Sequence, residues 1–359
     1  MTARSRYDLD RAELGEILAG EPRYRADQVW QGLYAQLAEP GQLTTLPRTL
    51  RERLDELLPA ALTVVTEQTS ATGDTVKLLW RLHDGVLIET VLMLYPDRAT
   101  VCVSTQAGCA MACGFCATGQ AGFSRHLSTG EIVEQVVRAA ARARLVDRRL
   151  SNVVFMGMGE PLANLDRVWS AVERIHADLG LSARHLTLST VGLVPGIDRL
   201  ARADLPVNLA VSLHAANDGL RDELVPVNRR YPLGALMAAC ARYLEAKGRR
   251  LSFEWALIDG INDRLDDAEE LAELGRSLPL APHVNLIPLN PTPGWPTKGT
   301  SAAGVRLFRD LLVARGVNAT IRRNRGTDID AACGQLAAGQ AVTVGPAGDA
   351  ATAPGRRRR

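Results

Sequence analysis

The chain is organised around the sequence Cys-Ala-Met-Ala-Cys-Gly-Phe-Cys at residues 109–116, which places three cysteines at the spacing C-x3-C-x2-C. An apolar run at residues 99–104, predicted to be a strand, precedes it. Three thiolates on one short loop can surround a single metal centre. They supply one ligand fewer than the four of a closed iron–sulfur cluster or structural zinc site. The stretch therefore predicts a metal centre with one position free for a substrate or cofactor.

From residue 99 onward, short apolar segments alternate with amphipathic ones. The clearest helix pattern runs over residues 131–146, and Ser128 with Glu131 forms a capping box at its start. Such alternation predicts an α/β protein whose parallel sheet, open or closed into a barrel, carries functional loops at the carboxyl ends of its strands. The predicted strands are 99–105, 152–156, 185–189, 207–213, 251–257 and 283–287, with a further candidate at 317–321.

The periodicity divides the chain into four parts. Residues 1–60 contain three amphipathic helical patterns and predict a small N-terminal helical accessory domain, either a packing appendage or a substrate-docking unit. Residues 61–95 alternate with a period of two and predict a β-rich linker segment carrying Glu89. Residues 96–343 form the core barrel. Residues 344–359, rich in Gly, Ala and Pro and ending in four arginines, predict a disordered basic tail.

The composition of the chain indicates the cellular compartment in which the protein works. The 359-residue chain is 46% apolar, which allows a large core, yet no apolar run approaches the roughly 18 residues of a membrane span. The N-terminus has no apolar signal core, so we expect a cytoplasmic protein without membrane association. Four of the six cysteines fall between residues 102 and 116, and in a reducing compartment such clustering is typical of metal or redox chemistry. The net charge of +2 gives no argument for nucleic acid.

A zinc site is the alternative for the cysteine loop, completed by Cys102, His126 or Cys333. Zinc prefers ligand pairs contributed from two places, and no second pair is present in the sequence. Cys240 lies among alanines on a helical pattern and is expected in the core.

Polar residues follow the other predicted strands. Residues 157–161 read Gly-Met-Gly-Glu-Pro; glycines let backbone approach a ligand, and the carboxylate can accept from an ammonium group. Each of these polar residues alone is more often a solvated loop residue. Together they predict a ring of polar groups, called the collar below, that could bind a ribose, a carboxylate and an adenine. The collar residues are Gly159, Glu160, Ser189, Ser212, Leu213, His214 and Asn290.

Glu89 is an isolated acid in the apolar run at residues 86–92. Such an acid usually lies on the solvated face of a strand. The minority interpretation is a buried carboxylate that could act as a base.

The motifs together resemble those of the RlmN/Cfr family of radical S-adenosylmethionine (SAM) adenine methyltransferases, and of its RlmN branch most. The resemblance covers residues 23–336. It implies a partial (β/α)6 radical SAM barrel whose [4Fe–4S] cluster is held by Cys109, Cys113 and Cys116, with SAM at the open iron and the collar around it. The matching motifs are the three cysteines with Phe115, residues 157–161, Leu-Ser-Thr at 188–190, Ser-Leu-His at 212–214 and Asp-Ile-Asp-Ala-Ala-Cys-Gly-Gln-Leu at 328–336.

The resemblance also implies a reaction. The family methylates C2 of an adenosine in 23S rRNA near the peptidyl-transferase centre and of adenosine 37 in certain tRNAs, or C8 in its Cfr branch. Two SAM molecules serve each turnover: one methylates Cys333, and the other yields the 5′-deoxyadenosyl radical that activates that methyl group. Cys102 then forms a transient disulfide with Cys333, which releases the product. Glu89 matches the base that takes the C2 proton.

The implied partners are 23S rRNA, tRNA and an electron donor such as flavodoxin, and we expect a monomer. Arg322, Arg323 and Arg325 are candidates for contacts with RNA phosphates, or else form a solvated charged loop. Two alternatives stay open from the residues alone: a radical SAM enzyme acting on a small molecule, and a zinc-dependent RNA-binding module without catalysis.

Overall fold

One ten-stranded sheet runs through the molecule, with the strand order β1-β2-β3-β4-β7-β8-β9-β10-β11-β12. The structure is a computed structural model that describes residues 4–249, 251–292, 294–295 and 297–338. The basic tail predicted at 344–359, and the end of the predicted core from 339 on, lie outside the described residues. The strands are β1 (Thr63–Thr69), β2 (Thr75–Arg81), β3 (Leu87–Leu94), β4 (Ala99–Cys102), β7 (Leu150–Phe155), β8 (Leu186–Thr190), β9 (Asn208–Ser212), β10 (Ser252–Leu257), β11 (His283–Pro288) and β12 (Asn318–Ile321).

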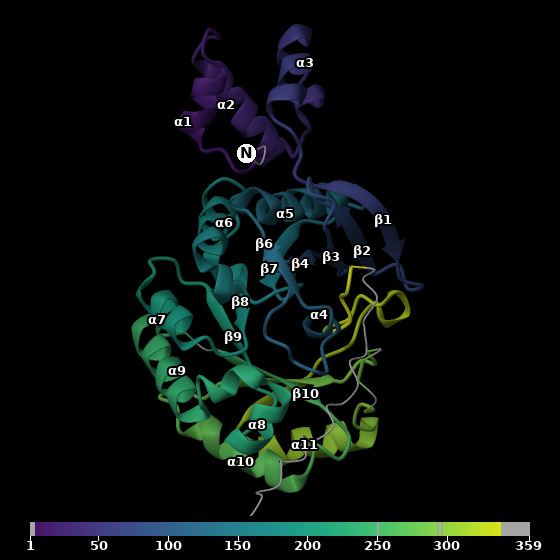
Figure 1. Cartoon of the computed structure of the whole chain (residues 1–359), viewed down its shortest axis with the longest axis vertical. Helices are drawn as coiled ribbons and strands as arrows, with labels where there is room; N and C mark the ends of the chain where they lie inside the picture. The colour runs from purple at the N-terminus through teal and green to yellow at the C-terminus, as the bar shows by residue number, and fades with distance from the viewer. Residues whose placement is uncertain (1–3, 250, 293, 296, 339–359) are drawn as a thin grey trace, which may run out of the picture.

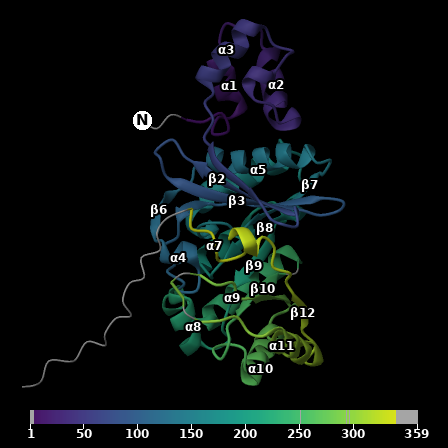
Figure 2. The same ribbon diagram turned by 90° about the vertical axis from the view of Figure 1, so that its right-hand side faces the viewer.

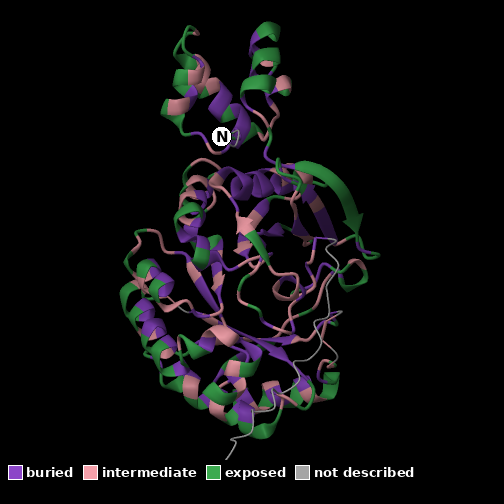
Figure 3. Cartoon of the chain, in the orientation of Figure 1, coloured by how far each residue is buried: buried purple, intermediate pink, exposed green. Residues whose placement is uncertain are grey.

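The strands from β4 to β12 pair in parallel and curve into an open barrel, with helices on the outer face (Figure 1). Six strand–helix units are followed by the last strand, β12, so the predicted α/β fold of a partial (β/α)6 barrel is confirmed. The inward helix faces and most of the barrel strands are buried, whereas strand β1 and the outer helix faces are exposed (Figure 3). The barrel helices are α4 (Ala117–Gln120), α5 (Thr129–Arg144), α6 (Leu165–Ala177), α7 (Val194–Arg202), α8 (Asp218–Leu224), α9 (Leu233–Lys247), α10 (Leu265–Arg276) and α11 (Ala302–Ala314).

All seven strands expected from residue 99 onward are found within two or three residues of their predicted bounds. Sequence reasoning missed a short hairpin, β5 (Gln106–Gly108) and β6 (Phe123–His126), which forms a separate two-stranded sheet. Its strands lie on either side of the cysteine loop in sequence. Among the helices of the described residues, none is long and apolar enough to cross a membrane.

The N-terminal helices stack on one end of the barrel, next to α5 and α6 (Figures 1 and 2). The indole of Trp30 donates to Asp178 at the end of α6 (2.9 Å), and Asp8 accepts from the backbone of Gly130 at the start of α5 (2.7 Å). Apolar side chains of these helices also join the hydrophobic core of the barrel. The helices are α1 (Arg11–Ile17), α2 (Tyr24–Gln31), which continues into a π-helix (Gly32–Gln36), and α3 (Arg48–Leu57).

Strands β1 to β3 are antiparallel and extend the barrel sheet outward from β4. The segment predicted as a linker is therefore continuous with the core sheet. Lys77 on β2 pairs with Val91 on β3, and Val91 pairs with Cys102 on β4. Directly paired residues point to the same face of a sheet, and residues two apart on a strand share that face. Lys77, Glu89 and Cys102 therefore lie on one face.

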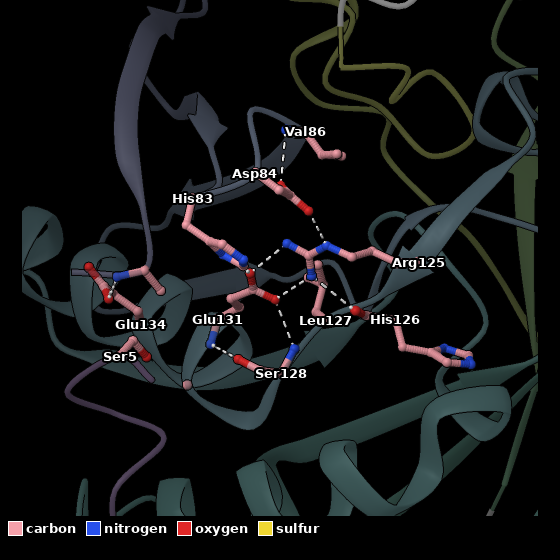
Figure 4. A network of polar contacts seen from close by, with 12 residues as sticks. Ser5, His83, Asp84, Val86, Arg125, His126, Leu127, Ser128, Glu131 and Glu134 are labelled. Carbon is pink, nitrogen blue, oxygen red and sulfur yellow. Dashed lines mark hydrogen bonds and ion pairs between the residues drawn. The ribbon is translucent and has the colours of Figure 1, made fainter. Parts of the chain in front are cut away.

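A buried carboxylate fixes the β5–β6 hairpin to the start of α5 (Figure 4). Arg125 on β6 makes two hydrogen bonds of 2.8 Å to the carboxylate of Glu131 and a third to Asp84 in the β2–β3 turn. Glu131 also accepts from the backbone of Ser128 (2.8 Å), and the Ser128 hydroxyl accepts from the backbone of Glu131 (3.1 Å). The predicted capping box is thus confirmed. The Arg125 hydrogen bond also lowers the pKa of Asp84.

Replacing the cap residue should weaken the fold by a small, defined amount. Ser128→Ala removes the acceptor for the first turn of α5, and we expect the free energy of unfolding in urea to fall by about 1 kcal/mol. Ser170→Ala is the control, because the Ser170 hydroxyl bonds only a carbonyl of its own helix. We expect the control to stay within about 0.5 kcal/mol of the wild type. Equal losses in both variants would contradict the capping role.

Candidate metal and substrate site

The three clustered cysteines lie on the loop between β5 and α4 and all line one cavity at the carboxyl ends of the barrel strands. Backbone bonds close the loop on itself: Cys109 donates to Gly122 (2.7 Å) and Cys116 donates to Cys113 (3.1 Å). Burial raises the pKa of Cys109 to about 12, and it also raises the pKa of Cys113. A metal that binds here would replace the thiol protons, since the thiolate is the ligand form.

The donor set fits a multi-atom cluster better than a single ion. Within the described residues, no group of three or more His, Cys, Asp or Glu side chains is arranged to hold one metal ion. The thiols instead border a cavity of about 160 Å³, in which one loop can surround a cluster and leave one metal position open to the barrel.

Most of the predicted collar converges on this cavity. Leu213 is the exception: it is fully buried in the core, because side chains alternate along the chain and its neighbours point into the cavity. The predicted residues that line the cavity are Cys109, Cys113, Cys116, Gly159, Glu160, Ser189, Ser212, His214, Asn290 and Cys333.

The turn that carries Gly159 and Glu160 is held in place by contacts with Gln106. Gly159 has a φ of +102°, and a Cβ there would lie 2.5 Å from the Cβ of Gln106. The Gln106 side chain accepts from the backbone of Glu160 (2.7 Å). No motif pointed to Gln106 in the sequence. Its side chain also pairs with the Nδ1 atom of His126 (3.0 Å), so the β5–β6 hairpin supports this turn.

The Glu160 carboxylate is buried and accepts from the backbone of Leu162 (2.9 Å) and of Val191 (2.8 Å). Burial raises its pKa to about 7, although these hydrogen bonds oppose the rise. A cationic ligand group in the cavity would favour the ionised carboxylate.

His214 is held as a neutral ring. Its Nδ1 atom accepts from the backbone of Ala256 (3.0 Å), and burial lowers its pKa to about 3. The Phe115 ring meets it edge-on, with ring centres 4.8 Å apart. The aromatic residue of the cysteine loop is therefore fixed against the end of β9.

Asn290 holds the segment that carries Cys333. After β12 the chain returns across the cavity, and the Asn290 amide donates to the carbonyl of Cys333 (3.0 Å). Ala117 donates to Gly334 (2.7 Å), and the Thr118 hydroxyl donates to Leu336 (2.6 Å). Asn290, predicted as part of the collar, thus positions Cys333 beside the cysteine loop.

Cys102 and Cys333 border a second cavity of about 270 Å³ that adjoins the first. Cys102 is buried at the end of β4, and Cys333 is exposed; both thiols are free. Burial raises the pKa of Cys102 to about 12, the nearby Cys333 raises it further, and Arg322 opposes the rise. The two cysteines are 231 positions apart in the sequence, so only the fold brings them together.

Glu89 is buried, as in the interpretation of a buried carboxylate and not on a solvated strand face. It is 4% exposed, and its Oε1 atom lies 3.2 Å from the Nζ atom of Lys77. Its Oε2 atom accepts from the backbone of Ala337 (2.9 Å) and Ala338 (3.0 Å). Sequence reasoning missed Lys77, because its partners lie on another strand and near the end of the described chain.

Of the three arginines expected to contact RNA phosphates, two contact other side chains of the protein. Arg322 lies 3.5 Å from the buried carboxylate of Glu254. Arg325 pairs with Asp74 (2.8 Å) and stacks on the ring of Tyr95. Arg323 is exposed.

An open α/β barrel with three cysteines after its first strand defines a radical SAM enzyme, and residues 103–275 match the radical SAM superfamily. A probable dual-specificity RNA methyltransferase RlmN from Chloroflexus aurantiacus is 51% identical over 96% of this chain and 95% of its own length. One from Frankia casuarinae is 54% identical over 92% and 82%. A crystal structure of a radical SAM methyltransferase from Sphaerobacter thermophilus superposes with a TM-score of 0.90 at 54% identity, over 93% of this chain and 99% of that one. The chain belongs to the RlmN family of radical SAM methyltransferases.

This superfamily implies a [4Fe–4S] cluster and SAM. The three cysteines fit such a cluster, since they line one cavity and would hold three of its four irons. Gly159, Glu160, Ser189 and Ser212 line the same cavity and would surround the SAM.

The raised pKa of Glu160 gives a pH dependence with a defined sign. Between its ordinary value of 4.5 and about 7, the folded protein holds the proton more tightly than the unfolded chain. The carboxyl group therefore lowers stability progressively as the pH rises through this window. Glu160→Gln should remove this slope, so that the change in unfolding free energy between pH 5 and 7.5 differs from wild type by about 2–3 kcal/mol.

Urea unfolding of the SAM-free protein at these pH values checks this expectation. Glu52→Gln, an exposed surface change, is the control and should follow the wild-type profile. Parallel profiles for Glu160→Gln and wild type would contradict the raised pKa.

Proposed function

We propose that the protein methylates C2 of an adenosine in 23S rRNA near the peptidyl-transferase centre and of adenosine 37 in certain tRNAs, through a methyl group carried on Cys333. One observation carries this proposal: Cys102 and Cys333 border one cavity directly beside the three-cysteine loop. A radical SAM enzyme that needed only its cluster would have no use for this second pair of thiols. The names of the relatives, probable dual-specificity RNA methyltransferases, support RNA as the substrate.

In the proposed reaction, different cysteines of the chain have different roles. Cys109, Cys113 and Cys116 hold the cluster, which when bound supplies the electron that cleaves SAM to a carbon radical. Cys333 is exposed on the segment over the cavity, so its thiol can take a methyl group from a first SAM and present it to an RNA base. A second SAM then activates that methyl group, which makes two SAM molecules per turnover.

Release of the product needs both a nucleophile and a base. In the covalent adduct, the former methyl carbon joins the Cys333 sulfur to the adenine carbon. The adduct formed by radical addition carries one unpaired electron, which would pass to a bound cluster, and Glu89 takes the proton from that adenine carbon. The Cys102 thiol then gives up its proton and attacks the Cys333 sulfur: the new S–S bond forms as the bond between sulfur and the former methyl carbon breaks, and that carbon takes up a proton to become the methyl group of the product. An external reductant restores both thiols.

We further propose that a one-electron donor such as flavodoxin feeds the cluster, and that the protein acts as a monomer in the cytoplasm. Arg323 is the exposed arginine of the trio expected to contact RNA, and it is our candidate for a phosphate contact.

Mass spectrometry of digested RNA tests the proposed function. Anaerobically reconstituted protein is incubated with SAM, a reductant and unmodified 23S rRNA or tRNA. We expect 2-methyladenosine from both RNAs, together with iron and sulfide in the protein. 8-Methyladenosine would instead assign the protein to the Cfr type of reaction. One zinc, no iron and no modified base would favour an RNA-binding module.

Replacing Cys102 should trap the adduct. In Cys102→Ala the Cys333 sulfur lacks its attacking thiol, so we expect protein covalently attached to RNA and a fall in released product on the order of 100-fold. Cys240→Ala is the matched control, since Cys240 is a buried free cysteine on α9 that lines neither cavity. Denaturing gel electrophoresis with labelled RNA separates adduct from free RNA. Equal product from both variants, with no adduct, would remove Cys102 from the mechanism.

A further inference from the structure

A buried lysine pairs with Glu89 across two strands. Lys77 lies on β2, diagonal to Glu89 on β3 and on the same face, and its side chain is 11% exposed. The sequence contains three lysines, at 77, 247 and 298, and Lys77 is the buried one. An ammonium group is rarely buried without a partner, and here the partner is the 3.2 Å contact with the Glu89 carboxylate.

The same pair of charges holds the segment that carries Cys333. The Lys77 ammonium donates to the carbonyl of Asp330 (3.4 Å), three residues before Cys333. The Glu89 carboxylate accepts from Ala337 and Ala338, four and five residues after it. The ion pair therefore contacts residues 330–338 on both sides of Cys333, while Cys333 itself is held by Asn290.

We propose that Lys77 is a positioning residue, which fixes the Glu89 carboxylate and the two flanks of the Cys333 segment relative to each other. This proposal rests on the proposed function, in which Cys333 carries the methyl group and Glu89 takes the proton from the same adenine. Cys333 and Glu89 must then both reach the same adenine, so the distance between them matters. Lys77 contacts the Glu89 carboxylate and, through the Asp330 carbonyl, the segment that carries Cys333.

Lysine suits this task. Its ammonium group has three donors and no acceptor, so it can serve a carboxylate and a carbonyl at once. Methionine at this position would keep an unbranched apolar stem and remove all three donors. The Glu89 carboxylate would then lie buried without its counter-charge, and the Asp330 carbonyl would lose its donor. The contacts of Asn290 with Cys333 and of Ala117 with Gly334 would remain.

If Lys77 is a positioning residue, Lys77→Met should affect two steps of the reaction to different degrees. Uptake of methyl by Cys333 from SAM, without RNA, uses the cavity side of the segment and should change less than threefold in Lys77→Met. Resolution of the RNA adduct uses Glu89 and should slow at least tenfold. A residue that only stabilised the fold would lower the yield of both steps together.

Hydrogen exchange and single-turnover kinetics on the cluster-containing protein test this. In Lys77→Met, the peptide covering residues 330–338 should exchange at least tenfold faster, while a peptide from β9 should not change. Single-turnover assays should show normal methylation of Cys333, by mass spectrometry, and accumulated adduct on the tRNA. Lys298→Met is the matched control, because Lys298 is exposed and far along the chain from β2; it should match wild type in both assays.

Each outcome decides the proposal. Unchanged exchange at residues 330–338 overturns it, and so does faster exchange with unchanged adduct resolution, which would leave Lys77 a structural residue only. If Lys77→Met does not fold, Lys77→Gln, which keeps one donor group, should show the same local change to a smaller degree. Wild-type protein that methylates no adenosine would sink the proposed function separately, and the exchange result would still decide whether Lys77 docks the segment.

Discussion

The site depends on one constraint, the return of the chain after β12 across the open mouth of the barrel. A parallel barrel sets the ends of its strands around one rim, but the cysteine that completes this site lies beyond the last strand. Asn290 and the Glu89 carboxylate bring that segment back by bonding its backbone atoms. Backbone contacts specify the path of a segment without depending on its side chains, which leaves the Cys333 thiol free for chemistry.

Local patterns sufficed for the barrel and for the cysteine loop. The strands from residue 99 onward are short apolar runs bounded by turns. The start of α5 is marked by Ser128 and Glu131, which bond each other and lie three residues apart in the sequence. The β5–β6 hairpin escaped prediction because its strands are three and four residues long and partly polar. Leu213 was assigned to the collar with its neighbours, although alternation along the chain turns it into the core.

Long-range contacts account for what the sequence could not predict. The surroundings of Glu89 come from β2 and from Ala337 and Ala338, more than 240 residues away, so no local window contains them. A period of two in residues 61–95 indicates strands, but it does not tell which sheet they join. Their pairing with β4 turns an expected linker into part of the barrel wall. That pairing sets Glu89 on the same face as Cys102.

The occupied carboxylate of Glu89 is compatible with a role as base, because its two oxygens differ. An ionised carboxylate offers about four lone-pair sites, two on each oxygen. Ala337 and Ala338 use both sites of Oε2, whereas Lys77 uses one site of Oε1. One site of Oε1 therefore remains for an incoming proton while the Cys333 segment stays docked.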